Sequence, residues 1–192
     1  MRMAIQQRVW TADEVRELID EQRAWPRYEA VDGELLVTPA PRPPHQYTAQ
    51  ILLAHLAAYA RRHGVGLALL PPADISFGAQ SIVQPDLFVV PAAQARPLLE
   101  WSQVTSLELA VEVVSPSSAR ADRGAKRRHY QRHGVREYWV VDLDARLIER
   151  WRPNDERPEV LDRELSWQPN PAAAPLVIDL PSFFAEVTAP FA

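Results

Sequence analysis

Apolar and polar residues follow two different spacings along the chain, and these spacings predict which segments form strands and which form helices. The run Leu107-Glu108-Leu109-Ala110-Val111-Glu112 alternates between the two classes, which is typical of a strand with two different faces. Ile51, Leu52 and Leu56 instead recur at helix spacing within a longer segment. Pro and Gly separate such segments, so the element boundaries can be placed from the sequence.

Helices are expected at residues 11–23, 45–63, about 118–133 and about 181–187, the first with a capping box formed by Thr11 and Glu14. Strands are expected in a hairpin around Asp32-Gly33 and at residues 67–70, 74–77, 82–90, 107–114, 137–142 and 147–151. This order predicts an α/β fold, with a mixed sheet flanked by helices and no regular βαβ array. A length of 192 residues suits one domain that spans residues 1–192.

The composition excludes several classes of protein. Hydrophobic residues make up 47% and charged residues 24%, which is an ordinary globular balance. The chain has no Cys, so disulfides, thiolate metal sites and a cysteine nucleophile are excluded. No signal peptide or membrane-spanning stretch is recognisable, and a cytoplasmic location is therefore expected.

The basic residues are unevenly distributed. The net charge is −4, yet residues 120–136 contain seven basic side chains against one acid, Asp122. A local basic face on an acidic protein is expected there. The chain contains a single lysine, Lys126, which suggests a position where a compact ammonium is needed and a guanidinium does not fit.

Two acidic residues interrupt strongly apolar strands. Glu112 lies near the end of the strand at 107–114, and Asp86 follows Pro85 within the segment 82–90. A carboxylate in such surroundings is costly unless it is paired or binds a cation. Asp86 and Glu112 together are therefore candidate ligands for a hard cation such as Mg²⁺.

The helix after Ser118 carries the candidate amine. Helical spacing places Arg123, Lys126 and Tyr130 on one face, and the large Tyr130 side chain indicates that this face packs on the sheet. Lys126 is then expected to point toward Glu112, where it would balance acidic charge and stabilise charge that develops on a phosphate.

Several ordered motifs make the sequence resemble the Uma2 family of restriction-endonuclease-like proteins. The motifs are Gln84-Pro85-Asp86, the run from Val111 to Ser117, the run from Asp122 to Tyr130, Tyr28-Glu29 with Asp32-Gly33-Glu34, His45-Gln46, and the run from Gly134 to Trp139. The resemblance covers residues 28–151. It implies a restriction-endonuclease-like core similar to that of PD-(D/E)XK nucleases, in which Asp and Glu bind Mg²⁺ and Lys assists attack of water on a phosphodiester.

Residue by residue, Pro85-Asp86 corresponds to the PD element and Glu112 to the (D/E) position. In the superfamily a lysine stands two residues after the (D/E) position, but this chain has Val114 there. The family resemblance implies that Lys126, on the following helix, takes the role of that lysine.

Additional site residues are expected around these three. Glu29, or alternatively Glu34, is a further candidate carboxylate, and His45 is expected to face the same cleft. Gln84 is expected either to hold the site water or to satisfy backbone groups.

The resulting expectation is a Mg²⁺-dependent endonuclease, with Mn²⁺ as a possible substitute, that acts on DNA or alternatively on RNA. Three arginines of the basic face are expected to contact backbone phosphates: Arg120, Arg123 and Arg127. Homodimerisation is implied by the family resemblance.

Three alternatives stay open. Val114 and the acidic net charge favour a catalytically inert binding or regulatory module on a nuclease-like scaffold. A structural protein of a larger complex is also compatible with the sequence. His129 and His133 have the spacing of a metal-binding pair, but without an accompanying acid motif a solvated or anion-facing role is favoured.

Overall fold

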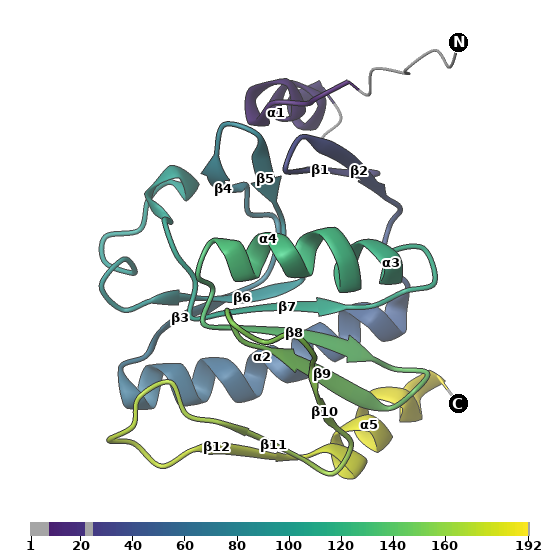
Figure 1. Cartoon of the computed structure of the whole chain (residues 1–192). Helices are drawn as coiled ribbons and strands as arrows, with labels where there is room; N and C mark the ends of the chain where they lie inside the picture. Colours follow the sequence, from purple (N-terminus) through teal and green to yellow (C-terminus); the bar gives the residue numbers. More distant parts are fainter. Residues whose placement is uncertain (1–7, 22–24, 192) are drawn as a thin grey trace.

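The computed structural model describes residues 8–21 and 25–191, and its centre is a six-stranded mixed sheet with helices on both faces (Figure 1). The strand order is β10-β9-β8-β7-β6-β3. Its strands are β3 (Gly66–Leu69), β6 (Leu87–Pro91), β7 (Leu109–Val113), β8 (Glu137–Asp142), β9 (Leu147–Trp151) and β10 (Glu159–Leu161). Only the β7–β8 pair is parallel among these neighbours, so the fold class predicted from the sequence is confirmed.

A four-stranded sheet, in the order β2-β1-β5-β4, lies beside the central sheet. Its strands are β1 (Arg27–Val31), β2 (Glu34–Thr38), β4 (Ile75–Gly78) and β5 (Ser81–Val83). The β1–β2 turn uses Asp32 (φ 54°) and Gly33 (φ 83°), the left-handed pair that a two-residue hairpin requires. Trp10 N donates to the Gly33 carbonyl at 2.9 Å, so the N-terminal segment is tied to this turn.

Helices cover the two faces of the central sheet (Figure 1). Those on the central sheet are α2 (Pro43–His63), α3 (Ala119–Ala121), α4 (Arg127–Arg132) and α5 (Leu180–Thr188), whereas α1 (Ala12–Glu21) packs on β1 and β5 of the smaller sheet. The short turns are η1 (Trp101–Gln103), η2 (Asp122–Lys126) and η3 (Ala189–Phe191). Leu52 and Leu56 of α2 pack with Val111 of β7, whereas Tyr130 of α4 packs with Ala110 from the opposite face of that strand. The alternation predicted for residues 107–114 is therefore confirmed for residues 109–113, whereas Leu107 precedes the strand and packs in the same cluster as Ala110.

Most predicted elements have the expected type. The strands at 137–142 and 147–151 match β8 and β9, and the capping box is present, with Glu14 N donating to Thr11 Oγ1 and Thr11 N donating to Glu14 Oε2. The last residues of the predicted helix at 11–23 lie outside the described residues. No described helix is both long and apolar enough to cross a bilayer.

Two predictions were wrong in ways that matter for the site. Residues 82–90 form two strands in two sheets, β5 and β6, because Pro85 has no N–H to donate to a strand ladder and breaks the run. No strand was predicted after residue 151, but the segment after Pro153 contributes β10 and a separate pair, β11 (Glu164–Trp167) and β12 (Leu176–Asp179). Each of these strands is only three or four residues long, which leaves too few positions for a clear alternation in the sequence.

The predicted helix at 118–133 is present, but its hydrogen-bond pattern changes from α-helical to π-helical and back. Residues 122–126 form a π-helical turn, in which Arg127 N bonds the Asp122 carbonyl five residues back. Tyr138 OH from β8 donates to the same carbonyl at 3.0 Å. The wider turn separates the directions of Arg123 and Lys126, which a regular helix was predicted to share.

Gly66 provides a test of the close approach of β3 to β6. A Cβ atom at residue 66 would lie 1.9 Å from the Val90 carbonyl oxygen, which belongs to the central sheet. Gly66→Ala is expected to lower the free energy of unfolding by at least about 3 kcal/mol, because the clash involves backbone and cannot be relieved by a side-chain rotation. Urea unfolding measures this loss. Gly78→Ala is the matched control, since a Cβ there meets nothing within 4 Å, and equal losses in both variants would contradict the packing.

Candidate active site

The only lysine of the chain lies buried among carboxylates. Lys126 Nζ donates to Glu112 Oε1 at 2.9 Å and lies 2.8 Å from Glu29 Oε2, an ion pair without hydrogen-bond geometry. Asp122 Oδ1 is 3.9 Å from the same nitrogen. Lys126 is 4% exposed, and the three acids are 1–2% exposed. The π-helical turn directs the ammonium toward the sheet, where β1 and β7 supply two of its partners.

Asp86 is the centre of a second cluster. Its Oδ1 is 3.0 Å from Arg27 Nη1, and its Oδ2 is 2.9 Å from His45 Nε2. The backbone N–H of Val113 also donates to Oδ2, at 3.0 Å. Because Leu87 pairs with Val111 in the antiparallel β6–β7 register, Asp86 lies at the level of the next residue, Glu112. The two predicted metal ligands are thus neighbours at one end of β6 and β7.

Glu29 connects the two clusters. Its Oε1 accepts a hydrogen bond from Gln84 N at 2.8 Å, while its Oε2 faces Lys126. Arg27, two residues earlier on β1, donates to the Gln84 carbonyl at 2.9 Å as well as to Asp86. The break at Pro85 therefore exposes backbone groups that β1 satisfies, and this interaction sets the position of Asp86.

Tyr130 supports Glu112 from one helical turn beyond Lys126. Its hydroxyl donates to Glu112 Oε1 at 3.2 Å, so this oxygen accepts two hydrogen bonds. Among the described residues, no donor reaches Glu112 Oε2, although Glu112 lines the cleft described below. One oxygen of Glu112 is thus held in place and the other is available.

The pKa values of these groups are shifted by burial and by their neighbours. Burial raises the pKa of Asp86, but His45, Arg27 and Lys126 outweigh it, so the pKa is lowered. Burial raises the pKa of Glu112 well above its ordinary value, more than Lys126 lowers it. Burial also raises the pKa of Asp122 to about 6. For Lys126 burial acts in the opposite direction, yet the surrounding carboxylates raise the pKa and keep the ammonium charged.

These side chains line a cleft of about 520 Å³, which we call the acidic cleft. The charged groups that line it are Arg27, Glu29, Arg42, His45, Asp86, Glu112, Asp122, Lys126 and Asp144. In its buried centre four carboxylates face two permanent cations, Arg27 and Lys126. When all four are ionised, their charge exceeds that of these two cations by two, an excess that one divalent cation would neutralise.

The structure brings together all six residues predicted from sequence as the catalytic group: Glu29, His45, Gln84, Asp86, Glu112 and Lys126. Gln84 acts through its backbone N–H, while its side chain donates to Asp74 Oδ1 at 2.9 Å. The alternative acid, Glu34, is exposed on β2 and does not line the cleft.

The three arginines predicted to bind nucleic acid do not line the acidic cleft. Arg123 is bonded to Asp142 and Glu149 at 2.7 and 2.6 Å. Arg127 donates to Gln131 and lies over the Trp151 ring, 4.7 Å from its centroid. Arg120 is exposed.

Three residues of the site were missed. Arg27 precedes Glu29 by two positions, the spacing of one strand face, and Asp122 and Tyr130 flank Lys126 at four positions, the spacing of one helix face. These spacings were the only features of the sequence that pointed to the three missed residues. They indicate shared faces but not the contacts with Asp86 and Glu112.

Lys126 is expected to be essential for stability as well as for any chemistry. Lys126→Met leaves three buried carboxylates without their main counter-charge, and removing one partner from a buried ion pair costs about 3–5 kcal/mol. Urea unfolding at neutral pH measures this loss. Arg128→Met is the matched control on the exposed side of α4 and should change stability by less than about 0.5 kcal/mol. A comparable, small effect of both substitutions would contradict the role of the buried ammonium.

The raised pKa of Asp122, about 6 against 3.8, predicts a pH-dependent stability. At pH values between 3.8 and about 6, Asp122 is protonated in the folded protein but ionised in the unfolded chain. The free energy of unfolding therefore falls as the pH rises through this window. Asp122→Asn removes that penalty and should stabilise the protein near pH 8 by roughly 1–3 kcal/mol, with little effect near pH 4. Thermal melts across the pH range test this, and destabilisation near pH 8 would contradict it.

Comparisons with known proteins agree with this fold. A crystal structure described as that of a putative nuclease belonging to DUF820, from Anabaena variabilis, has the same fold, with a TM-score of 0.73. The match covers 93% of this chain and 99% of that chain at 19% sequence identity. No curated protein matches the sequence. The family model Uma2, described as "Putative restriction endonuclease", matches residues 12–182 and supports a nuclease-like function. Since this match spans most of the sequence, the chain belongs to the Uma2 family.

Proposed function

We propose that the protein is a Mg²⁺-dependent endonuclease that hydrolyses phosphodiester bonds in DNA, with Mn²⁺ able to replace Mg²⁺. The observation that carries the proposal is the charge of the acidic cleft, where four buried carboxylates face two permanent cations. A divalent cation would replace the protons that the raised pKa values of Glu112 and Asp122 favour, because metal ligands bind in their ionised form. The description of the Uma2 family supports the same class of activity.

The donor groups suit a hard divalent cation. Mg²⁺ prefers carboxylate oxygens and retained water, and the cleft offers both an open volume and oxygen ligands. Glu112 would bind through Oε2, since its Oε1 is occupied by Lys126 and Tyr130. Asp86 would bind through lone pairs not used by its present partners, because each carboxylate oxygen can accept more than one interaction.

The bound ion would polarise the scissile phosphate and lower the pKa of a water molecule. Lys126 would contribute positive charge to the phosphate as negative charge builds in the transition state. Its raised pKa keeps it protonated, so it acts as a cation and hydrogen-bond donor and not as a base. Glu29 holds the ammonium at 2.8 Å and is a positioning residue in this scheme.

A second cavity provides space for the rest of a nucleotide. It has a volume of about 530 Å³ and shares Trp25, Arg27, Pro41, His45 and Asp86 with the acidic cleft. Its further lining includes apolar side chains such as Leu70 and Pro72. With a phosphate in the acidic cleft, a base would lie in this adjoining cavity, where Trp25 is 42% exposed. Base stacking on an aromatic ring tolerates different sequences.

Contacts to the flanking phosphates would come from the cleft rim. Arg42 lines the acidic cleft and is exposed, and Arg120 is exposed near the start of α3. Arg123 and Arg127 already have partners. In the proposed complex, Arg42 and Arg120 are therefore the main phosphate contacts of the chain.

One observation favours a second candidate, a nucleic-acid-binding module without catalysis. Both oxygens of Asp86 are already bonded, to Arg27, His45 and the Val113 backbone. If these bonds persist when Mg²⁺ is present, the cleft would bind a phosphate through its cations without activating water.

Isosteric substitutions distinguish the two candidates. Asp86→Asn and Glu112→Gln are expected to reduce Mg²⁺-dependent nicking of plasmid DNA by at least about 10³-fold, because each removes charge from the metal site. Plasmid, single-stranded DNA and RNA should be compared with Mg²⁺ and with Mn²⁺. Glu164→Gln is the matched control, since Glu164 is exposed on β11 and does not line the cleft.

Each outcome of this experiment supports or removes a different candidate function. Loss of nicking in both site variants, with folding and the control activity preserved, supports the endonuclease. DNA binding without cleavage by any form of the protein supports the binding module. Cleavage unchanged in both site variants would remove the assignment of Asp86 and Glu112.

A further inference from the structure

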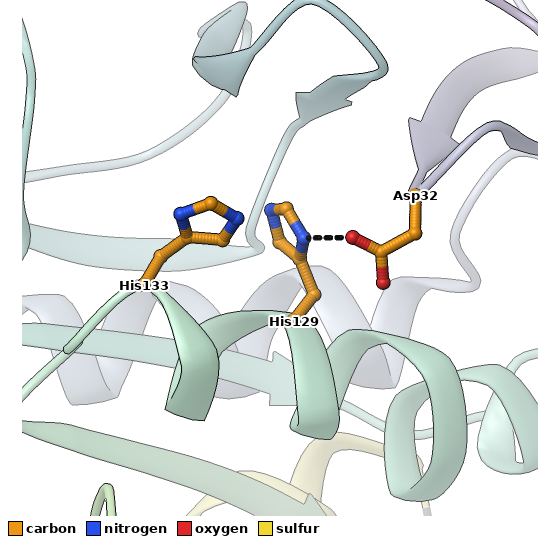
Figure 2. Close-up of side chains that lie close together, drawn as sticks. All are labelled: Asp32, His129 and His133. Carbon is orange, nitrogen blue, oxygen red and sulfur yellow. Dashed lines mark hydrogen bonds and ion pairs between the residues drawn. The ribbon is translucent and has the colours of Figure 1, made fainter.

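A second cluster of potential metal ligands lies outside the acidic cleft. Its members are Asp32 at the β1–β2 turn, His129 on α4 and His133 at the end of α4 (Figure 2). His129 Nδ1 lies 3.1 Å from Asp32 Oδ1, and the two imidazole rings are 4.5 Å apart between centroids. One ligand atom from each residue lies within 4.8 Å of the others. None of the three lines the acidic cleft.

The fold brings Asp32 to the helix through the same two elements that form the ion pair of the active site. Glu29 of β1 meets Lys126, and three residues further along each segment Asp32 meets His129. The left-handed backbone of Asp32 turns its side chain at the tip of the hairpin toward α4 (Figure 2). The sequence alone showed the histidine pair but not this acid, which is 97 residues away.

His129 is the unusual member of the cluster. It is 0% exposed and faces the carboxylate of Asp32, so of the two roles expected from the sequence the solvated one was wrong for this residue and the anion-facing one is present. Its Nδ1 faces Asp32 and is the nitrogen that would bind a metal ion, while its Nε2 is buried without a bond to any described residue. Burial also lowers the pKa of His129, which favours the neutral imidazole that binds metals.

We propose that Asp32, His129 and His133 form a site for a borderline transition-metal dication such as Zn²⁺. Two imidazoles and one carboxylate are a donor set that suits Zn²⁺ and leaves a position for water, whereas Mg²⁺ prefers oxygen ligands only. This inference does not depend on the proposed nuclease function, because it uses none of the cleft residues.

The spacing of the donors fits such an ion after a small movement. Ligands at about 2.1 Å in a tetrahedron are roughly 3.4 Å apart, close to the 3.1 Å between His129 Nδ1 and Asp32 Oδ1. The largest separation, up to 4.8 Å, would close by rotation of His133, which is half-buried at the helix end. Phe77 stacks on the His133 ring at 5.3 Å and 17°, so it limits the directions in which that ring can turn.

Arg132 would compete with the proposed ion for the carboxylate of Asp32. Its guanidinium binds both oxygens of Asp32, at 3.0 and 3.1 Å. Its side chain is 56% exposed, so it can move into solvent when a cation binds. A purely structural cluster would be weakened by loss of Arg132, whereas a metal site would gain affinity from removal of a nearby positive charge. This opposite effect makes Arg132→Ala an informative variant.

The experiment uses the untagged full chain. Zn²⁺ binding is measured by calorimetry in excess Mg²⁺, and Co²⁺ binding by its visible absorption, which reports nitrogen-containing coordination of low number. We expect one Zn²⁺ per chain. His133→Ala and Asp32→Asn should weaken binding at least about tenfold, and Arg132→Ala should strengthen it several-fold. Asn tolerates the left-handed backbone at position 32, so this variant should keep the hairpin.

Two controls separate this site from the rest of the molecule. His55→Ala removes an exposed histidine of α2, and Glu112→Gln alters the acidic cleft; both should retain wild-type Zn²⁺ affinity. The proposal is overturned if wild-type protein binds no Zn²⁺ in excess Mg²⁺, if His133→Ala binds as tightly as wild type, or if Glu112→Gln abolishes binding. Failure of this test leaves the nuclease proposal unaffected, because that rests on cleavage by the cleft variants.

Discussion

The buried ammonium of Lys126 is the interaction on which the site depends. A charge in the protein interior is tolerated only when opposite charges compensate for its lost hydration. Here the compensation comes from three places, β1 through Glu29, β7 through Glu112 and the helical segment itself through Asp122. One side chain therefore joins the smaller sheet, the central sheet and the segment that covers them. The π-helical turn belongs to this arrangement, because it directs residue 126 inward.

The same carboxylates make the cleft poorly balanced as a purely structural element. Arg27 and Lys126 do not neutralise the four acids when all are ionised, and the pKa values of Glu112 and Asp122 are raised by burial first and by the neighbouring carboxylates in addition. Natural proteins retain such unfavourable arrangements mainly where binding or chemistry uses them. A fold that needed only stability would place fewer acids here. The excess charge is thus the physical link between the architecture and the proposed metal-dependent activity.

Strand β1 and helix α4, with the π-helical turn that precedes it, approach each other at two points with different chemistry. At the first, Glu29 faces an ammonium within an oxygen-rich cleft that suits a hard cation. At the second, Asp32 faces an imidazole next to another imidazole, a set that suits a softer ion. The two points are three residues apart along both segments. Two neighbouring positions of one packing interface can therefore discriminate between cations through ligand type alone.

Sequence patterns alone determined which residues face which side of the regular elements, but not of the π-helical turn, where Arg123 and Lys126 diverge. Alternation placed Glu112 opposite Val111 and Val113, and helical spacing placed Lys126 with Tyr130, because both patterns are properties of the local backbone. Only the tertiary structure decided which distant groups meet. Arg27 and His45 reach Asp86 because Pro85 ends a strand, and Asp32 reaches His129 across 97 residues because the hairpin docks on the helix. Local periodicity encodes the direction of a side chain, whereas its partner depends on packing between segments that no local pattern specifies.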